Sequence, residues 1–179
     1  FIGGGRRGPG STRHREVEDA RDVALPQDDE VDSGWDDRAP IVAQVPEPSA
    51  LIRLHWAEPA EGQYGEMETI VVGERLGAAL YIRPDMGSLG PDIAARAARD
   101  PLLRESIVYL TCVHELGHAL GLRHTRDFQD IMYFFGYGGD IPKYFGRYRA
   151  QLRSRADIAK VSRLSRGDVT RLKALYELP

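Results

Sequence analysis

The feature that most constrains this chain is a stretch of eleven residues that holds three histidines, one glutamate and two glycines. It reads HELGHALGLRH and covers residues 114–124. His114 and His118 are four residues apart, so on a helix they share one face and lie about 6 Å apart along the axis. Both imidazole rings can then reach one metal ion.

The third histidine must lie outside that helix, because a further helical step would carry it too far along the axis. Gly121 supplies the break, since glycine adopts the left-handed conformation at little cost and lets the chain turn back. His124 then approaches the ion that His114 and His118 share. Three protein ligands leave a fourth position for water, which is the pattern of a catalytic zinc site rather than a closed structural one. We therefore expect one catalytic zinc ion.

Glu115 has a side chain long enough to reach that water without binding the metal. Zinc lowers the pKa of bound water towards about 7, and Glu115 is the candidate general base that accepts its proton and passes it to a leaving amine. The competing interpretation is that these histidines are core residues on an amphipathic helix. That core would be costly, because every buried polar ring needs a hydrogen-bond partner.

Upstream of residue 114, apolar residues occur in short or alternating runs that are typical of strands. Strands are predicted at residues 41–45, 50–56, 68–72 and 78–82. Gly73 and Gly77 lie between the last two runs and favour a hairpin there. Residues 84–91 contain two glycines and two prolines, which predict a loop.

Asp100 and Pro101 predict a helix start, as an N-cap acid followed by proline at the first helical position. Apolar and histidine positions at spacings of three and four continue the pattern to Gly121, the predicted stop. Two later helices are predicted near residues 142–153 and 165–176. Strands come first and helices after, which favours an α+β domain.

Length and composition limit the classes of protein that this chain can belong to. The 179 residues suit one domain, and the net charge of -3 argues against a general nucleic-acid binder. No run of 18 apolar residues exists, so no membrane span is expected. Residues 1–30 are predicted to be a flexible arm, and residues 31–179 the domain that carries the histidines. The chain begins with Phe1 and shows no apolar signal-peptide core, so we expect a trimmed or processed form.

The complete pattern resembles the metzincin metalloproteases, whose signature is His-Glu-x-x-His-x-x-Gly-x-x-His followed by a methionine-containing turn. Residues 130–133 are similar to that turn, and Met132 would form a hydrophobic floor beneath the metal without binding it. Thr125 and the closing helix make the chain most similar to the matrixins, in a small bacterial-type form. The resemblance implies that Asp168 is buried and hydrogen-bonds the methionine turn.

The resemblance also implies an architecture and an activity. The fold would be zincin-like: a twisted mixed sheet of five strands, an active-site helix, a methionine turn and a C-terminal helix. The activity would be that of a zinc-dependent endopeptidase that binds extended polypeptide against an antiparallel edge strand, for which residues 68–72 are the candidate. Family habit implies a secreted or periplasmic protein, and we expect a monomer.

The chain departs from the matrixin pattern directly after the methionine. Phe134 stands where matrixins usually have proline, and residues 134–163 form an aromatic and basic insertion before the last helix. Tyr133, Phe134 and Tyr137 are candidates for the wall of a substrate pocket. Alternatively the rings anchor the extra helix to the core, and the two roles can belong to different rings.

Two other functions stay open. One is a zinc-containing peptide-binding domain without turnover, against which the presence of Glu115 counts. The other is an archaemetzincin-type aminopeptidase, which would carry several cysteines after the third histidine, whereas this chain has only Cys112. Calcium binding is also open but unsupported, because Asp85 and Asp92 flank a loop whose spacing matches no calcium motif.

Overall fold

The computed structural model describes residues 45–57 and 64–177. In this part of the chain three strands precede four α-helices, so the predicted α+β class is confirmed. The strands are β1 (Ile52–Trp56), β2 (Gly65–Val72) and β3 (Arg75–Ile82), and the helices are α1 (Pro91–Arg99), α2 (Pro101–Ala119), α3 (Ile141–Arg149) and α4 (Arg166–Tyr176). Short 3-10 turns lie at η1 (Glu47–Ser49), η2 (Gly87–Leu89), η3 (Phe135–Tyr137) and η4 (Arg155–Ala159).

Some predictions concern residues outside this description. The arm at residues 1–30 lies outside it, and so does nearly all of the strand predicted at 41–45. The division into an arm and a domain at 31–179 therefore stays a prediction. In the described ranges, no helix combines the length and apolar character that a membrane span requires.

The sheet has the order β1-β3-β2, with β1 parallel to β3 and β2 antiparallel to it. The predicted hairpin is confirmed, but its strands are longer than expected, since Val72 pairs with Arg75 and only two residues form the turn. Gly73 has a φ of 63°, which a two-residue hairpin turn requires and glycine adopts freely. Gly77 was expected in the turn and instead lies within β3, where a β-carbon would collide with the backbone of Leu51.

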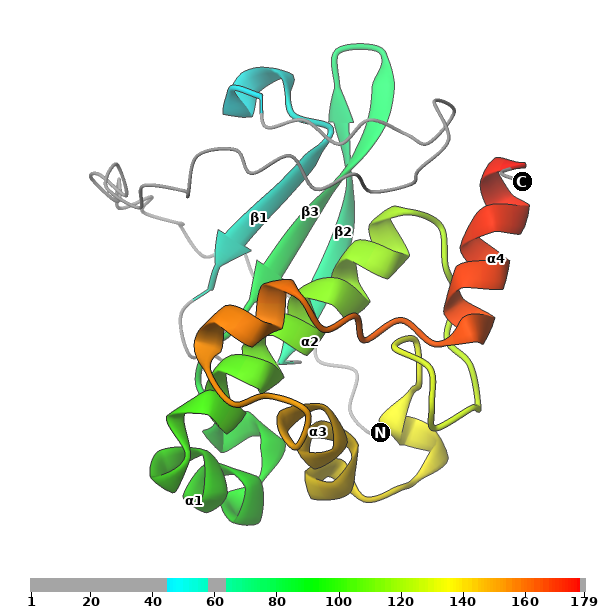
Figure 1. The fold of residues 1–179 in the computed structure, drawn as a ribbon. Coiled ribbons are helices and arrows are strands. Elements are labelled where there is room, and N and C mark those ends of the chain that lie inside the picture. The colour runs from blue at the N-terminus through cyan, green and yellow to red at the C-terminus, as the bar shows by residue number, and fades with distance from the viewer. Residues whose placement is uncertain (1–44, 58–63, 178–179) are drawn as a thin grey trace. The chain divides into compact units, whose positions relative to one another are not determined.

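One face of the sheet packs against α2. Ala78, Leu80 and Ile82 of β3 are buried and alternate along the strand, as the two-residue period of a strand requires. Leu103, Ile107 and Leu110 are the buried apolar positions of α2, the helix that packs against β2 and β3. Figure 1 shows α2 crossing the sheet, with α1 and α3 beside its first turns and α4 near its end.

The predicted boundaries of the histidine helix are confirmed. The Asp100 side chain accepts a hydrogen bond from the Leu103 amide at 3.1 Å, and Pro101 takes the first helical position. The helix ends at Ala119, and Gly121 has a φ of 88°. The amide of Leu122 then donates back to the carbonyl of Gly117 at 2.8 Å. This closing turn sends the chain back alongside the helix that it has just left.

Helix α1 is missing from the sequence interpretation. It begins at Pro91, which was placed at the end of a loop, and it continues through an alanine-rich segment to Arg99. Its signals are short: proline at the first position, Asp92 in the first turn, and a single apolar pair, Ile93 and Ala97, that is buried. One i, i+4 pair is too brief a period to stand out from a loop that is rich in glycine and proline.

The insertion at residues 134–163 contains α3, which ends four residues before the predicted 153. Tyr144, Phe145 and Tyr148 are buried, so these rings anchor α3 to the core. The Arg149 guanidinium contacts the Asp100 carboxylate at 2.8 Å and thereby joins the end of α3 to the start of α2. For these three rings the anchoring interpretation is confirmed.

Candidate metal centre

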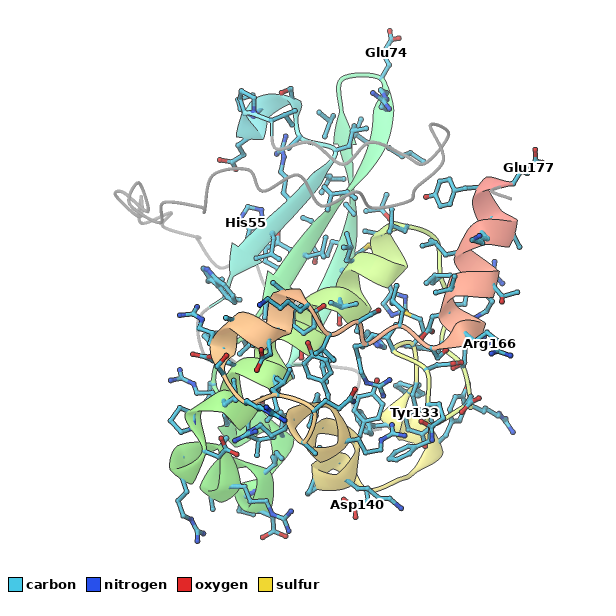
Figure 2. All side chains as sticks on the ribbon, viewed as in Figure 1. His55, Glu74, Tyr133, Asp140, Arg166 and Glu177 are labelled. Carbon is cyan, nitrogen blue, oxygen red and sulfur yellow. The ribbon has the colours of Figure 1, made fainter. Side chains whose placement is uncertain are left out.

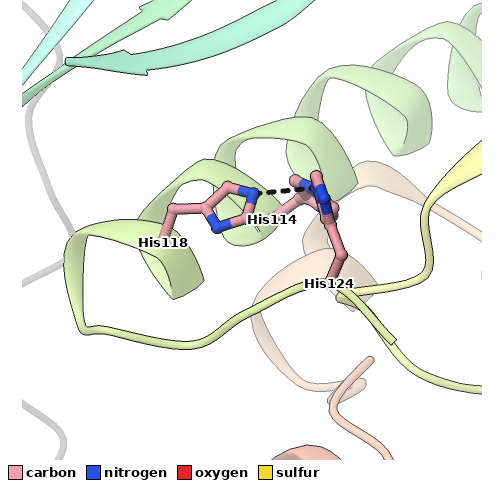
Figure 3. Close-up of side chains that lie close together, drawn as sticks. All are labelled: His114, His118 and His124. Atoms are coloured by element: carbon pink, nitrogen blue, oxygen red, sulfur yellow. Dashed lines mark hydrogen bonds between the residues drawn. The ribbon is translucent and has the colours of Figure 1, made fainter. Parts of the chain in front are cut away.

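The three histidines of the sequence motif come together in space. His114 and His118 project from α2, and His124 comes from the segment that turns back after Gly121 (Figure 3). The Nε2 atom of His124 lies 3.3 Å from Nε2 of His114 and 3.1 Å from Nε2 of His118. Among the described residues this is the one group of three or more histidine, cysteine or acidic side chains with the spacing of metal ligands.

Backbone carbonyls orient two of the three rings. Nδ1 of His114 lies 2.7 Å from the Ile131 carbonyl, and Nδ1 of His118 lies 3.0 Å from the Leu122 carbonyl. A carbonyl can only accept, so each Nδ1 is the donor, and in a neutral ring Nε2 then carries a lone pair. The lone pairs of His114 and His118 therefore point towards His124. This is the arrangement that outer-shell partners impose on metal-binding histidines.

The spacing of the nitrogens fits zinc. Ligands at 2.0–2.1 Å in a tetrahedral site are separated from one another by roughly 3.3 Å. The two short nitrogen distances at His124 match that value. The donor set, three imidazoles, is also one that zinc binds in open catalytic sites.

The protonation states of His114 and His124 also favour metal binding. Burial is the main reason that the pKa of His114 is lowered to about 4; the neighbouring His118 and His124 also lower it, whereas the Ile131 carbonyl and Asp168 oppose the shift. The pKa of His124 is lowered by burial and by His118. Both rings are therefore neutral near pH 7, with a nitrogen free to bind a cation.

His124 owes its position to backbone pairing between two loop segments. The Thr125 amide donates to the Met132 carbonyl at 2.9 Å, and the Phe134 amide donates to the Thr125 carbonyl at 3.4 Å. These bonds form an isolated parallel bridge between Thr125 and Tyr133. The segment after the helix is thus fixed to residues 130–133, the segment predicted to be the methionine turn.

Met132 is fully buried and packs against α2 between the two helical histidines. A β-carbon at Gly117 would collide with its sulfur, so glycine is needed for this close approach. Leu122 contacts the same position on the helix. Met132 therefore lies against the turn of α2 that carries His114 and His118.

Asp168 connects α4 to the same segment. It is buried at 1% exposure and accepts hydrogen bonds from the amides of Ile131 at 2.8 Å and Ser165 at 2.9 Å. The Ile131 carbonyl in turn accepts from Nδ1 of His114. Hydrogen bonds thus connect Asp168 to His114 through the backbone of a single residue, Ile131.

The sequence interpretation missed the rest of this network. Asp130 is buried and accepts from Thr125 at 2.8 Å, from Ser165 at 2.5 Å and from Arg171 at 2.7 Å. Burial alone would raise the pKa of Asp130, but these hydrogen bonds outweigh it and hold the pKa below its usual range. Ser165 and Asp168 form a capping box, and that local spacing is the one sequence signal that could have drawn attention to this end of α4.

Tyr144 is a second residue that the sequence analysis did not connect with the site. Its hydroxyl lies 2.9 Å from the Asp130 carbonyl and 3.2 Å from the Ile131 carbonyl. The insertion thus supports the same peptide group that orients His114. No local pattern signals this contact, because it joins α3 to a loop across the core.

Glu115 is buried, with 6% of its surface exposed. Burial, and to a lesser degree the charge of Glu66, raise its pKa to about 7. The start of β2 lies against its side chain: a β-carbon at Gly65 would be 2.7 Å from Oε1 of Glu115 and 2.5 Å from Thr111. The carboxylate is therefore enclosed between α2 and β2, on the helix that carries His114 and His118.

The three aromatic candidates have different surroundings. Tyr133, labelled in Figure 2, is buried among other rings, and its hydroxyl donates to the Gly138 carbonyl at 2.6 Å. Phe134 and Tyr137 are 42% and 49% exposed. The Phe134 ring stacks on His124 at 4.7 Å between centroids, and the Tyr137 ring meets Phe134 edge-on.

The comparisons with known proteins gave one match. A family model described as Matrixin matches residues 35–143, well over half of the 179 residues. The match includes the three strands, α1, α2 and the three histidines, and it ends within α3. Comparisons with curated proteins and with solved structures returned no match.

Proposed function

The chain belongs to the matrixin family, a family of zinc metalloproteases, and from that premise we propose that it is a zinc-dependent endopeptidase. The observation that carries the proposal is the convergence of three Nε2 atoms, on rings of which two are oriented by hydrogen bonds from Nδ1 to backbone carbonyls. His114, His118 and His124 would hold one zinc ion. When bound, zinc polarises a carbonyl oxygen and lowers the pKa of a water molecule towards about 7.

Glu115 is proposed to move the proton. It lies one residue from His114 on the same helix and is enclosed by Gly65 and Thr111, so its carboxylate has little freedom to turn away. A buried carboxyl whose pKa is raised can accept a proton from water near neutral pH and return it to a leaving amine. Among the described residues, no lysine or arginine forms an ion pair with it.

An extended polypeptide is the proposed substrate. Among the described strands β2 lies at one end of the sheet order and pairs only with β3, so its other edge can accept a further strand. Its first residue, Gly65, lies next to Glu115. A peptide paired with β2 would therefore run past the carboxylate. Matrixins are generally extracellular, and we extend that location and a monomeric state to this chain as part of the proposal.

Gly121, Met132 and Asp168 are proposed to support the centre without touching substrate. Gly121 permits the turn that brings His124 back, and Met132 packs beneath Gly117. Asp168 accepts from the amide of Ile131, whose carbonyl orients His114. Their roles are positional, and each acts through one of the histidines.

The decisive variant is Glu115→Gln, which keeps the size of the side chain and removes its basicity. We expect one zinc ion per chain in both the wild type and the variant, measured by metal analysis. Cleavage of an unstructured protein substrate should fall by about 10²–10⁴-fold, the range of a general-base contribution. A zinc chelator should abolish wild-type cleavage, and added zinc should restore it.

The controls separate this function from its alternative. Glu105→Gln is the matched control, since it changes a glutamate near the start of the same helix, far from the histidines. Equal cleavage by the wild type and Glu115→Gln would remove Glu115 from the mechanism. Stoichiometric zinc with no cleavage by the wild type would favour the zinc-containing peptide-binding domain instead.

A further inference from the structure

The three rings of the metal centre are not held in the same way. Nδ1 of His114 and Nδ1 of His118 each donate to a backbone carbonyl. In the part of the chain that the structure describes, no hydrogen bond reaches Nδ1 of His124. His124 is also the exposed member of the group and the one outside α2. Some other contact has to keep its ring turned towards the helix.

The Phe134 ring makes that contact. It stacks face to face on the His124 imidazole, with 4.7 Å between centroids and 17° between the planes. A flat ring packed on one face of an imidazole resists rotation of the imidazole out of its plane. Such aromatic pairs stabilise the fold by more than the area that they bury would predict. The stack leaves the edge of His124 with Nε2 directed at the other two histidines.

The backbone keeps the two rings opposite each other. The bond from the Phe134 amide to the Thr125 carbonyl fixes residue 134 beside residue 125, one position after His124. This is the end of the bridge between Thr125 and Tyr133. The backbone register therefore places the two residues where their rings can stack.

The residues that follow Phe134 leave space for its ring. A β-carbon at Gly136 would collide with several atoms of the Phe134 ring, so glycine is needed for the stack to form. The Tyr137 ring meets Phe134 edge-on at 5.4 Å, and the Arg126 guanidinium covers Tyr137 at 4.9 Å. Tyr137 therefore packs against the ring that stacks on His124.

We propose that Phe134 is a positioning residue for His124, which holds the third imidazole by stacking as the carbonyls of Ile131 and Leu122 hold the other two by hydrogen bonds. The inference rests on the proposed role of His124 as a zinc ligand. Loss of an outer-shell partner of a metal-binding histidine typically weakens metal binding by about 10–100-fold. Loss of the stack should act in the same way, through His124.

The test compares zinc release from four variants. Phe134→Leu removes the ring, Phe134→Tyr keeps it, and Gly136→Ala leaves Phe134 in the sequence but displaces its ring. Trp56→Leu is the control: it truncates another exposed aromatic residue, which has no ring contact with a histidine among the described residues. Zinc-loaded protein is mixed with a chromogenic chelator, and the release rate and the dissociation constant are measured.

We expect release at least about tenfold faster in Phe134→Leu and in Gly136→Ala, and unchanged release in Phe134→Tyr and Trp56→Leu. Combining Phe134→Leu with Gly136→Ala should add little to either change, because both remove the same contact. In metal-free protein, the His124 ring protons should lose the ring-current shift of Phe134 in both single variants. That spectrum needs neither zinc nor activity.

If Phe134→Leu released zinc at the wild-type rate, or if the His124 spectrum did not change, the positioning role would be overturned. Slower cleavage with unchanged zinc release would also overturn it and would make Phe134 a substrate contact. A wild-type protein that binds no zinc would overturn the proposed function, and the metal-free spectrum would still decide whether the stack exists.

Discussion

Tyr137 is the outermost ring of the cluster beside the histidines. It is 49% exposed, packs edge-on against Phe134 and lies beneath the Arg126 guanidinium. It makes no ring contact with His124, whereas Phe134 does. A side chain in this position can meet a bound peptide without holding the metal centre together.

At the residue scale we therefore expect Tyr137→Ala to change substrate preference more than zinc content. Removing the ring takes away apolar surface that a large substrate side chain would cover. The cleavage rate should therefore fall most for peptides with large apolar residues near the cleaved bond. A peptide library read by mass spectrometry gives the preference, and metal analysis gives the zinc. Tyr137→Phe keeps the ring and serves as the control. An unchanged cleavage profile in Tyr137→Ala would remove this residue from the substrate-binding surface.

Single residues differ in how far a sequence can predict them. His114 and His118 follow from helical spacing, and Gly121 and His124 follow from the geometry of one turn, so all four depend on local rules. Asp130 is different, because its partners Ser165 and Arg171 lie 35 and 41 residues further along the chain. Contacts across that separation have no local pattern, and only the folded arrangement reveals them.

At the scale of elements, the contact between Asp100 and Arg149 joins two helices. The Asp100 carboxylate caps α2 through the Leu103 amide and binds the Arg149 guanidinium from the end of α3. Burial alone would raise the pKa of Asp100, but the hydrogen bonds from Arg149 and Leu103 outweigh it and lower the pKa. One carboxylate thus starts the histidine helix and fixes the insertion against it.

This contact predicts a specific acid sensitivity. Since the pKa of Asp100 is lower in the folded than in the unfolded chain, its stabilisation is present above about pH 4 and is lost as the pH falls through the folded value. Asp100→Asn keeps a good N-cap and loses the charge. Urea unfolding between about pH 5 and 2 should therefore show a smaller acid-induced loss of stability in the variant than in the wild type.

Asp92→Asn is the control for that experiment, since Asp92 is an exposed acid in the first turn of α1. It shows how much of the change in pH dependence comes from the loss of one negative charge alone. Identical pH dependence in Asp100→Asn and the wild type would show that the carboxylate of Asp100 has the same proton affinity in both states, contrary to the prediction.

Among the elements, those with repeated or capped patterns could be predicted. Helix α2 has a cap, a proline, a long apolar period and a glycine stop, and all four agree. Helix α1 has only one buried pair and was missed. The extra residues of β2 and β3 were also missed, because glycines in a strand resemble turn residues until the close approach of Leu51 to Gly77 is known.

At the scale of the whole molecule, a metal ion at the three histidines would connect separate parts of the fold. His114 and His118 belong to α2, whereas His124 belongs to a segment that is hydrogen-bonded to Met132 and, through Asp130, to α4. A ligand that binds only the folded state stabilises it by mass action. Zinc binding should therefore be visible in the stability of the complete domain.

We expect removal of zinc to lower the melting temperature of the wild type, and re-addition to restore it. At free zinc about 1,000 times the dissociation constant, the linkage is about 4 kcal/mol, or about 10 °C for a domain of this size. Differential scanning calorimetry with and without chelator measures the shift. His124→Ala should show a much smaller shift. A melting temperature in the wild type that does not respond to zinc would contradict the proposed metal centre.

Gly65 has a consequence for where a bound chain would be cut. No side chain larger than hydrogen fits between the first residue of β2 and the Glu115 carboxylate, so the position of the strand relative to the carboxylate is fixed. A peptide paired with β2 would advance by about 3.4 Å along the strand for each of its residues. The register of pairing with β2 would then determine which peptide bond lies at Glu115. The side chains of the peptide would decide only which sequences bind in that register.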